Sequence, residues 1–392
     1  MIKRLAALAA MVFVLVGSPA WAQDPIRVGV IAPFTGPFAI IGTNFKAGIE
    51  AYQTVHGDGV DGRKVEFLYR DLQNTDVAAA RALAQELVSK DRVSYLAGFY
   101  FTPDALAVAP LLERAGVPLV IFNAATSVIT EKSPLIVRTS FTMAQVTVPM
   151  GQIAREQNIS KVVIAVSDYA PGLDTELAFK ESFEKAGGKI VDTIRIPLRT
   201  SDFSPIMQRI KDSGAEAVFA FLPSGPPTLA FAKSFIDNGV KERGIRLLSL
   251  GAVTQESDLP SLGDAVLGVQ STWHYSTAHP GAVNKAFLDA IQRKLGTLEE
   301  ITFPAVGAYD GVHIIYEMIK ATKGERKPKE AVEAVKGMSW ESPRGPVKID
   351  PETRHIRQNV YLREVAKQDG RYINKEIRTF PDQPDFGLMK SN

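Results

Sequence analysis

The 392-residue chain contains no cysteine, so several kinds of site are excluded at once. Without a thiol there is no disulfide, no thiolate metal site and no cysteine nucleophile. A large exported domain can do without disulfides, because its hydrophobic cores are large enough to stabilise it. The 45% share of hydrophobic residues is sufficient for such cores.

An excess of charge of one sign is also missing. The 45 Lys and Arg residues nearly balance the 43 Asp and Glu residues. No basic cluster or basic helix stands out, and such clusters are the usual mark of a nucleic-acid surface. We therefore expect no nucleic-acid partner.

Short signatures of catalytic and cofactor sites are absent as well. No P-loop, H-E-x-x-H or G-x-S-x-G sequence occurs. The five histidines never pair at helical i, i+4 spacing, which speaks against a zinc site or a Ser-His-Asp triad. Gly57, Gly59 and Gly62 match G-x-G-x-x-G by letter, but they precede a predicted strand, which favours a turn. We expect no catalytic residue, no metal and no cofactor.

Only the N-terminus carries a long uninterrupted hydrophobic run. Two basic residues are followed by the apolar run Leu5 to Val16, which is too short to span a membrane, and then by the small-x-small sequence Ala20-Trp21-Ala22. This pattern predicts a signal peptide over residues 1–22, cleavage after Ala22 and a periplasmic location. The alternative is an N-terminal membrane anchor.

The remaining residues alternate strand-like and helix-like patterns, and the pattern restarts near residue 144. The predicted strands cover residues 26–32, 64–70, 95–98, 119–122, 135–139, 161–167, 189–196, 215–222, 246–250, 265–272 and 360–366. The predicted helices cover residues 44–55, 75–88 with Thr75 as cap, 103–115, 144–156, 173–186, 203–212, 228–238, 284–295, 305–322 and 329–335. The tail from Phe380 is expected to be irregular. These two successive series of alternating strands and helices predict an α/β fold with two similar Rossmann-like lobes.

One strand-helix-strand unit suggests a binding site. Its strands are Tyr95–Gly98 and Leu119–Phe122, and ligands of parallel sheets bind outside the carboxyl ends of strands. Two loops leave those ends, Phe99–Thr102 and Asn123–Ser127. Both offer backbone N–H groups and a hydroxyl, and the first opens a helix whose positive N-terminus suits an anion such as a carboxylate. The alternative is that both loops are simple connectors.

In the second series of strands and helices, three loops also follow the carboxyl ends of predicted strands. Tyr169 follows the strand at 161–167, where its ring can cover a ligand and its hydroxyl can donate a hydrogen bond. The alternative is a tyrosine that packs on its own loop. The loops Leu222–Gly225 and Gly251–Thr254 end the next strands, and together the three form the opposite wall of a cleft.

Several segments carry a resemblance to a known family. They are IRVGVIAPFTGPFAIIG, GVDGRKVEFLYRD, FNAATS, the pair Asp168-Tyr169, LGDAVLGVQSTWHY and GAYDGVHIIYEMIKA. In order and spacing the chain resembles the periplasmic binding proteins of ABC importers that carry branched-chain amino acids and related solutes. The resemblance covers nearly the whole mature chain. It implies a type I periplasmic binding-protein fold, a solute bound between two lobes, delivery to a membrane permease, no enzymatic activity and a monomer.

The resemblance also implies lobe boundaries. In this family the chain crosses three times between the lobes, and the corresponding hinges here lie near Thr142, Trp273 and Gly345. The N-terminal lobe is then expected to hold residues 23–142 and 274–345, and the C-terminal lobe residues 143–273 and 346–392. Solute closes the hinge by its higher affinity for the closed state.

Ligand-binding residues follow from the resemblance by position. The family holds the ligand carboxylate with a hydroxyl residue in the first loop and with the Ala and Thr of an Ala-Ala-Thr loop, which places Thr102, Ala124 and Thr126 in that role. Tyr169 matches a tyrosine that reaches the ligand, and Phe221 or Leu222 stands near a further aromatic position.

One departure from the family changes the expected ligand. Amino-acid binders carry an acidic residue just after the Gly that corresponds to Gly251, where it meets the ligand ammonium. Here no carboxylate follows until Glu256, and an unpaired buried ammonium would cost several kcal/mol. The predicted cleft is rich in aromatic residues, which stack well on flat apolar groups. We therefore expect a small carboxylate with a flat apolar body, such as a benzoate derivative.

The candidate ligand-binding residues are Phe38, Tyr100, Phe101, Thr102, Asn123, Ala124, Thr126, Tyr169, Phe221 and Thr254. One alternative is that Glu256 or Asp258 swings into the cleft and that the ligand is an ordinary branched-chain amino acid. A ligand sensor would reuse the same fold. An α/β hydrolase is disfavoured, because no nucleophile and base motif stands at a strand end.

Overall fold

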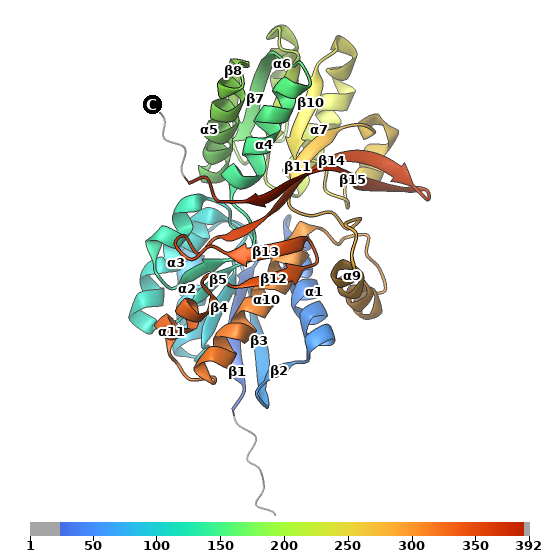
Figure 1. Cartoon of the computed structure of the whole chain (residues 1–392). Helices are drawn as coiled ribbons and strands as arrows, with labels where there is room; N and C mark the ends of the chain where they lie inside the picture. Colours follow the sequence, from blue (N-terminus) through green and yellow to red (C-terminus); the bar gives the residue numbers. More distant parts are fainter. Residues whose placement is uncertain (1–23, 388–392) are drawn as a thin grey trace, which may run out of the picture.

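Two open sheets, one above the other, organise the computed structural model, which describes residues 24–387 (Figure 1). The predicted signal peptide lies outside the described residues. The first sheet has the strand order β2-β3-β1-β4-β5-β6. The second has the order β12-β13-β14-β11-β10-β9-β7-β8, and β15 pairs with β14. Helices flank both sheets, so the predicted α/β class with two similar halves is confirmed.

The first sheet and its helices hold the N-terminal part of the chain and three later helices. Its strands are β1 (Ile26–Ala32), β2 (Gly59–Val60), β3 (Arg63–Asp71), β4 (Tyr95–Gly98), β5 (Leu119–Ile121) and β6 (Ile136–Arg138). Its helices are α1 (Ala39–His56), α2 (Val77–Ser89), α3 (Thr102–Ala115), α9 (Ala282–Leu295), α10 (Phe303–Thr322) and α11 (Pro328–Val335). Helix α1 packs against α9 and α10, and α2 packs against α3.

The second sheet joins parallel and antiparallel strands. Its strands are β7 (Lys161–Ser167), β8 (Lys189–Ile196), β9 (Ala217–Phe221), β10 (Arg246–Leu250), β11 (Gln270–Trp273), β12 (Ser339–Ser342), β13 (Gly345–Ile349), β14 (Ile356–Gln368) and β15 (Arg371–Gln383). Its helices are α4 (Met143–Glu156), α5 (Ala170–Lys185), α6 (Ser204–Asp212), α7 (Pro226–Asp237) and α8 (Leu259–Leu262). Short 3-10 turns cover η1 (Ser127–Lys132), η2 (Lys241–Arg243) and η3 (Gly263–Val266).

The central strands are buried on both faces, as expected for parallel strands that helices cover on each side. Strands β4, β5 and β9 are buried along their whole length. Their sequences are short continuous runs of apolar residues, and this is why hydrophobic runs located them well. The predicted bounds of β1, β4, β7, β8 and β10 match the structure residue for residue.

Three local predictions are wrong. Helix α2 is capped by Asp76, whose side chain accepts hydrogen bonds from the backbone of Ala78 and Ala79, and not by Thr75. The strand predicted over residues 265–272 begins only at 270, because Gly268 adopts a positive φ of 80° and the preceding residues form η3. The tail is not irregular from Phe380, since β15 continues to residue 383.

The chain passes between the sheets after β6, after β11 and along β14. The long strand β14 begins beside the first sheet, where the carbonyl of Arg354 accepts a hydrogen bond from the backbone N–H of Arg138 at 3.0 Å. Further along, Leu362 of β14 pairs with Thr272 of β11 in the second sheet. In Figure 1, β14 and β15 are the red ribbons that run between the two halves.

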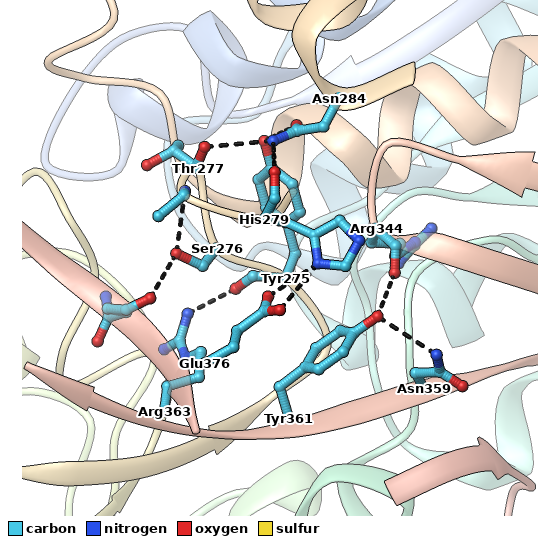
Figure 2. A network of polar contacts seen from close by, with 12 residues as sticks. Tyr275, Ser276, Thr277, His279, Asn284, Arg344, Asn359, Tyr361, Arg363 and Glu376 are labelled. Carbon is cyan, nitrogen blue, oxygen red and sulfur yellow. Dashed lines mark hydrogen bonds and ion pairs between the residues drawn. The ribbon is translucent and has the colours of Figure 1, made fainter. Parts of the chain in front are cut away.

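A polar network holds the passages after β11 and at β14 together (Figure 2). The hydroxyl of Tyr361 on β14 donates to the carbonyl of Arg344 at 2.8 Å. His279, in the segment after β11, lies 2.9 Å from a carboxylate oxygen of Glu376 on β15. Arg363 donates to the carbonyl of Tyr275 at 2.5 Å. These contacts anchor the segment that follows the last residue of β11.

A buried ion pair completes this region. The side chains of Arg344 and Asp310 are both fully buried and form an ion pair. Asp310, on α10, also accepts hydrogen bonds from Trp340 and Ser342, each at 2.8 Å. Arg344 donates in addition to the carbonyl of Ser140, in the passage after β6. One buried pair therefore links α10, the β12–β13 hairpin and the first passage.

Within residues 24–387, no helix combines the length and the hydrophobicity that a membrane span requires.

Candidate functional site

A pocket lies between the two sheets, where the strands of both end. Residues at the carboxyl ends of seven strands line it, from β4, β5, β6, β7, β9, β10 and β11, together with the first residue of α10. The lining residues are Tyr100, Asn123, Ala125, Phe141, Met143, Tyr169, Pro171, Phe221, Pro223, Ser224, Ala252, Trp273 and Phe303. This is the position at which open parallel sheets bind ligands.

A larger cavity of about 280 Å³ lies elsewhere, at the amino ends of β10 and β11. Its wall includes Arg246 and Gln270, the first residues of these two strands, and side chains of α7. Because ligands of such sheets bind at the carboxyl ends of the strands, we take the smaller pocket between the sheets as the candidate site.

Flat aromatic side chains form much of the pocket wall. The rings of Tyr169 and Phe221 are nearly parallel, with an interplanar angle of 10° and centroids 6.3 Å apart. Trp273 packs against Phe141 at 4.7 Å and edge-on against Phe303 at 4.9 Å. Such surfaces suit a planar ring, which gains both burial and favourable ring geometry.

An unusual backbone conformation presents Tyr100 to the pocket. Phe99 adopts a φ of 62°, in the left-handed region that bulky residues avoid. Gly98 before it has a φ of 103°, and a Cβ there would lie 2.5 Å from the carbonyl oxygen of Ile31. Strained residues of this kind gather at functional sites. The turn directs the Tyr100 hydroxyl to the second sheet, where it donates to the carbonyl of Ser224 at 2.7 Å.

The loop that carries Tyr169 is held at the pocket by the close packing of α5 against the end of β7. A Cβ at Gly172 would lie 1.7 Å from the carbonyl oxygen of Ser167, so only glycine allows α5 to begin this close to the end of β7. Tyr169 is the N-cap residue of α5, and Pro171 stands in the first turn. The first turn of α5 therefore forms part of the pocket wall.

The pocket wall has no charged side chain, but several helices begin at it. Met143 and Phe303 are the first residues of α4 and α10, Tyr169 caps α5, and Ser224 and Tyr100 stand two residues before α7 and α3. Each helix N-terminus carries about half a positive charge from its backbone dipoles. The wall is thus suited to an anion and offers no carboxylate for an ammonium group.

Three buried polar atoms of the pocket wall lack a hydrogen-bond partner among the described residues. They are Oδ1 of Asn123, Oγ of Ser224 and Nε1 of Trp273. These residues are only 6%, 2% and 1% exposed. A buried polar atom without a partner costs about 1–3 kcal/mol, so unpaired atoms that share one pocket point to a ligand that pairs with them.

The cavity between these side chains has a volume of about 30 Å³. Because an enclosed water needs about 10–15 Å³ on a comparable measure, this space holds roughly two water molecules. This space is smaller than an aromatic ring, so the side chains of the wall have to move to admit one.

Four of the predicted site residues line the pocket: Tyr100, Asn123, Tyr169 and Phe221. Phe38 and Phe101 form a second layer, with ring centroids 5.7 Å and 4.5 Å from that of Tyr100. They support the wall and do not line it.

The structure does not bring Thr102, Ala124 or Thr126 to the pocket wall. Thr102 and Ala124 are fully buried, and the hydroxyl of Thr102 donates to that of Thr126 at 3.3 Å. The backbone N–H of Ala124 donates to the carbonyl of Phe99 at 3.0 Å and is therefore not free. Contact of these residues with a ligand carboxylate stays a prediction.

The N-terminus of α3 already holds an anionic group of the protein. Asp104, in its first turn, is buried and accepts hydrogen bonds from the Thr75 hydroxyl and the Asp76 backbone N–H. Burial raises the pKa of Asp104 to about 6. The predicted use of this helix end for a ligand carboxylate is weakened accordingly.

Thr254 and Glu256 lie in a separate polar cluster of the second sheet. Thr254 donates to Ser271 at 2.9 Å, and its carbonyl accepts from Asn374. A carboxylate oxygen of Glu256 lies 3.7 Å from the buried guanidinium of Arg363. In the loop after β10, Ala252 lines the pocket where Thr254 was expected.

Nine lining residues were not named as candidates from the sequence, although Ala125, Pro223, Ser224 and Ala252 lie in loops that were predicted to form the cleft. Phe141 follows β6 and Trp273 ends β11, so the rule that ligands bind at strand ends would have found both. Phe303 comes from the start of α10, far along the chain, and no local signal identifies it. The other lining residues that were not named as candidates are Ala125, Met143, Pro171, Pro223, Ser224 and Ala252.

Within the described part of the chain, no group of three or more His, Asp or Glu side chains is placed to hold a metal ion. His274, next to Trp273, is fully buried, and burial lowers its pKa well below the usual value. Its ring stacks on Phe141 at 4.8 Å. His274, which directly follows the lining residue Trp273, is therefore neutral.

Comparison with known proteins agrees with this geometry. Residues 25–371 match the protein family described as "Periplasmic binding protein". The Leu/Ile/Val-binding protein homolog 6 of Brucella melitensis is 57% identical over 387 residues, which cover 98% of this chain and 99% of that protein.

Two solved structures are similar over nearly their whole length. A solute-binding protein of an ABC transporter from Rhodopseudomonas palustris, in complex with p-hydroxybenzoic acid, has a TM-score of 0.93 at 58% identity, covering 94% of this chain and 100% of that chain. A second, from another strain of that species and in complex with 3,4-dihydroxybenzoic acid, has a TM-score of 0.89 at 44% identity, covering 93% and 99%.

These similarities confirm the resemblance found in the sequence, including the type I fold of two α/β halves. The family and the structural neighbours are solute-binding proteins. The chain belongs to the periplasmic binding protein family.

Proposed function

We propose that this protein is the periplasmic solute-binding component of an ABC importer and that it captures an aromatic acid, such as a hydroxybenzoate, between its two sheets. The chain delivers the acid to a membrane permease, acts as a monomer and catalyses no reaction. The signal peptide over residues 1–22 directs export, and cleavage after Ala22 releases the mature chain.

One observation carries the proposal, namely the composition of the pocket wall. Flat rings such as those of Tyr169 and Phe221 meet helix N-termini there, without a charged side chain. An aromatic carboxylate has the matching parts, since its ring stacks on the aromatic wall and its charge is stabilised by the helix ends.

The ligands of the two structural neighbours support the same class. One holds p-hydroxybenzoic acid and the other holds 3,4-dihydroxybenzoic acid. Both are planar carboxylates, and the chain is 58% and 44% identical to the proteins that bind them.

An amino-acid ligand is less well supported. Neither acidic residue of this loop lines the pocket: a carboxylate oxygen of Glu256 lies 3.7 Å from the Arg363 guanidinium, and Asp258 accepts a hydrogen bond from Gln255 at 2.7 Å. A ligand ammonium in the pocket would remain unpaired at a cost of several kcal/mol.

The proposed mechanism is hinge closure. The ligand touches both sheets and therefore stabilises the closed arrangement by its differential affinity. We propose lobe boundaries of 23–142 with 274–345 and of 143–273 with 346–392, the division that the family resemblance implies. The Tyr100 hydroxyl, which donates to the Ser224 carbonyl, is a direct contact between the two halves at the pocket.

The proposal is tested by a thermal-shift screen of residues 23–392, followed by titration calorimetry. The panel holds 4-hydroxybenzoate, 3,4-dihydroxybenzoate, benzoate, leucine, valine and succinate. A ligand at 100 times its Kd adds about 2.7 kcal/mol to the free energy of unfolding, which raises Tm by several degrees. We expect shifts with the aromatic acids only.

A shift with leucine or valine, and none with any aromatic acid, would overturn the proposed ligand class. It would also mean that Glu256 leaves Arg363 to meet the ammonium, which a Glu256→Gln variant would reveal by loss of that shift.

A further inference from the structure

We propose that Asp174 couples closure of the two halves to the uptake of a proton, so that this protein binds its ligand more tightly under mildly acidic conditions than at neutral pH. The inference rests on the proposed hinge closure and concerns a residue that does not line the pocket. The proton then acts as a second ligand, and its binding reinforces the binding of the first.

The carboxylate of Asp174 lies where the second half meets the first half, which is the first sheet with its helices. Asp174 stands one turn into α5, a helix of the second half that also contacts α3 of the first half. The Thr126 hydroxyl and the Ser127 backbone N–H donate hydrogen bonds to the carboxylate, and the charge of Arg138 lies nearby. These three residues belong to the first half, around the start of η1 and at the end of β6. The first half therefore covers a carboxylate of the second.

This carboxylate is covered without being fully paired. Oδ2 of Asp174 is buried and has no hydrogen-bond partner among the described residues. Arg138 is fully buried and donates from Nη2 to the carbonyl of Thr126 at 2.5 Å, while its Nε and Nη1 remain unpaired there as well. The guanidinium thus offers charge but no hydrogen bond to Asp174. Burial of a carboxylate with incomplete pairing favours its neutral form.

The other ionisable groups around Asp174 behave differently. Burial is the main reason why the pKa of Asp174 is raised to about 6, and the like charge of Asp385, in the segment after β15, acts in the same direction. Asp385 itself stays ionised, because its contacts with His355 and Ser127 lower its pKa despite its burial. Burial lowers the pKa of His355 and raises that of Tyr169, so both side chains are neutral at pH 7. Asp174 is thus the carboxylate of this cluster that changes its charge near pH 6.

Separation of the two halves would remove the cause of this shift. Thr126, Ser127 and Arg138 then move away with the first half, and water reaches the carboxylate, whose pKa returns towards the value of about 3.9 of a solvated aspartate. The closed arrangement therefore binds more protons than the open one between about pH 4 and pH 6. Closure and the ligand binding that depends on it are favoured at the acidic end of this window, weaken as the pH rises to about 6 and are constant above it.

The experiment measures the Kd of 4-hydroxybenzoate by calorimetry at pH 5.5, 6.5 and 7.5 and at constant ionic strength. We expect the wild-type protein to bind about threefold more tightly at pH 5.5 than at pH 7.5. In Asp174→Asn the amide keeps an acceptor for the donors of the first half but does not titrate. Its Kd should be nearly the same at all three pH values, and at pH 7.5 it should be lower than that of the wild type.

Asp192→Asn is the matched control. Asp192 lies on β8 of the second half and forms an ion pair with Arg209 of the same half, at 2.6 Å. Closure does not change this pairing, so the variant should keep the wild-type ratio of Kd values between pH 5.5 and pH 7.5.

A second measurement needs no variant and stays decisive if Asp174→Asn fails to fold. The heat of 4-hydroxybenzoate binding, measured in two buffers of different ionisation enthalpy, counts the protons that the protein takes up. We expect about half a proton per protein molecule at pH 6 and none at pH 8.

Equal affinity of the wild-type protein at all three pH values would overturn this inference and leave the proposed function intact. A pH dependence that persists in Asp174→Asn, or binding without proton uptake at pH 6, would overturn it as well. Failure of every aromatic acid to bind would overturn the proposed function and, with it, this inference.

Discussion

Two polar regions lie between the sheets of this protein, and they differ in how completely they are paired. The Asp310 carboxylate and the Arg344 guanidinium are both paired, with partners from α10, the β12–β13 hairpin and the first passage. In the pocket, by contrast, the polar atoms of Asn123, Ser224 and Trp273 have no partner among the described residues.

This difference suggests that the paired region serves stability and that the pocket serves ligand binding. A buried polar network whose members are satisfied holds segments in one arrangement, and here it links passages between the sheets. Unsatisfied atoms reduce stability, and those that line a pocket can be paired by a ligand. The first region should therefore control the free energy of unfolding, and the second should control affinity and selectivity.

The largest expected effect comes from breaking the paired region. Asp310→Ala leaves the Arg344 charge buried without its partner, and we expect a loss of about 3–5 kcal/mol in the free energy of unfolding. Urea denaturation measures it. The double variant Asp310→Leu with Arg344→Met should recover part of that loss, because it removes both charges.

That double variant also tests whether the paired region and the pocket act independently. If the paired region serves stability alone, the ratio of Kd values for 4-hydroxybenzoate and benzoate stays at its wild-type value. A change in this ratio would show that the two regions are not separate.

A smaller effect is expected at Asp174 of α5, which does not line the pocket. Burial raises its pKa to about 6, although hydrogen bonds from Thr126 and Ser127 and the nearby charge of Arg138 act in the other direction. In the unfolded chain the pKa of an aspartate is about 3.9. The native state therefore binds more protons than the unfolded state between about pH 4 and pH 6.

The contribution of Asp174 to the free energy of unfolding therefore falls as the pH rises from about 4 to 6, and it is constant above this range. Asp174→Asn removes the buried charge, so it should be more stable than the wild type by about 1 kcal/mol at pH 7.5, with no difference below about pH 4. Urea denaturation at several pH values measures this.

Asp192→Asn serves as the matched control for this titration. A hydrogen bond from Arg209 lowers the pKa of Asp192, so its substitution should reduce stability at pH 7.5. If both variants moved in the same direction, the effect of Asp174 would not come from its buried charge.

The smallest effect is expected at an exposed ion pair. Lys285 and Asp289 lie one turn apart on α9, and their side chains are 75% and 48% exposed. Lys285→Ala should change the free energy of unfolding by less than about 0.5 kcal/mol, because solvent screens such pairs. A loss comparable to that of Asp310→Ala would contradict the assignment of stability to burial and pairing.

Local signals were enough to predict most of the fold. Buried parallel strands such as β7 are continuous apolar runs, so their bounds could be read directly. The tail was mispredicted because Pro381 suggested an irregular segment. Pro381 lies on β15, which among the described strands pairs with β14 alone, and a proline is tolerated on such an edge strand since the missing N–H is not needed there.

The candidate site was predicted only in part. The strand-end rule located Tyr100, Asn123, Tyr169 and Phe221, because it depends on strand positions that periodicity reveals. It could not show that the N–H of Ala124 is used by Phe99. It also could not identify Phe303, which comes from a helix that packs on the first sheet.

The sequence by itself determined the strands and helices, the loops at the strand ends and the family. These depend on apolar periodicity, on glycine and proline positions and on short segments, all of which are local. Only the tertiary structure decided which polar atoms remain unpaired. The partner of the Tyr100 hydroxyl is Ser224, and that of Glu256 is Arg363, each more than a hundred residues away. Hydrogen bonds and ion pairs require contact in space, and no local pattern specifies which distant groups will meet.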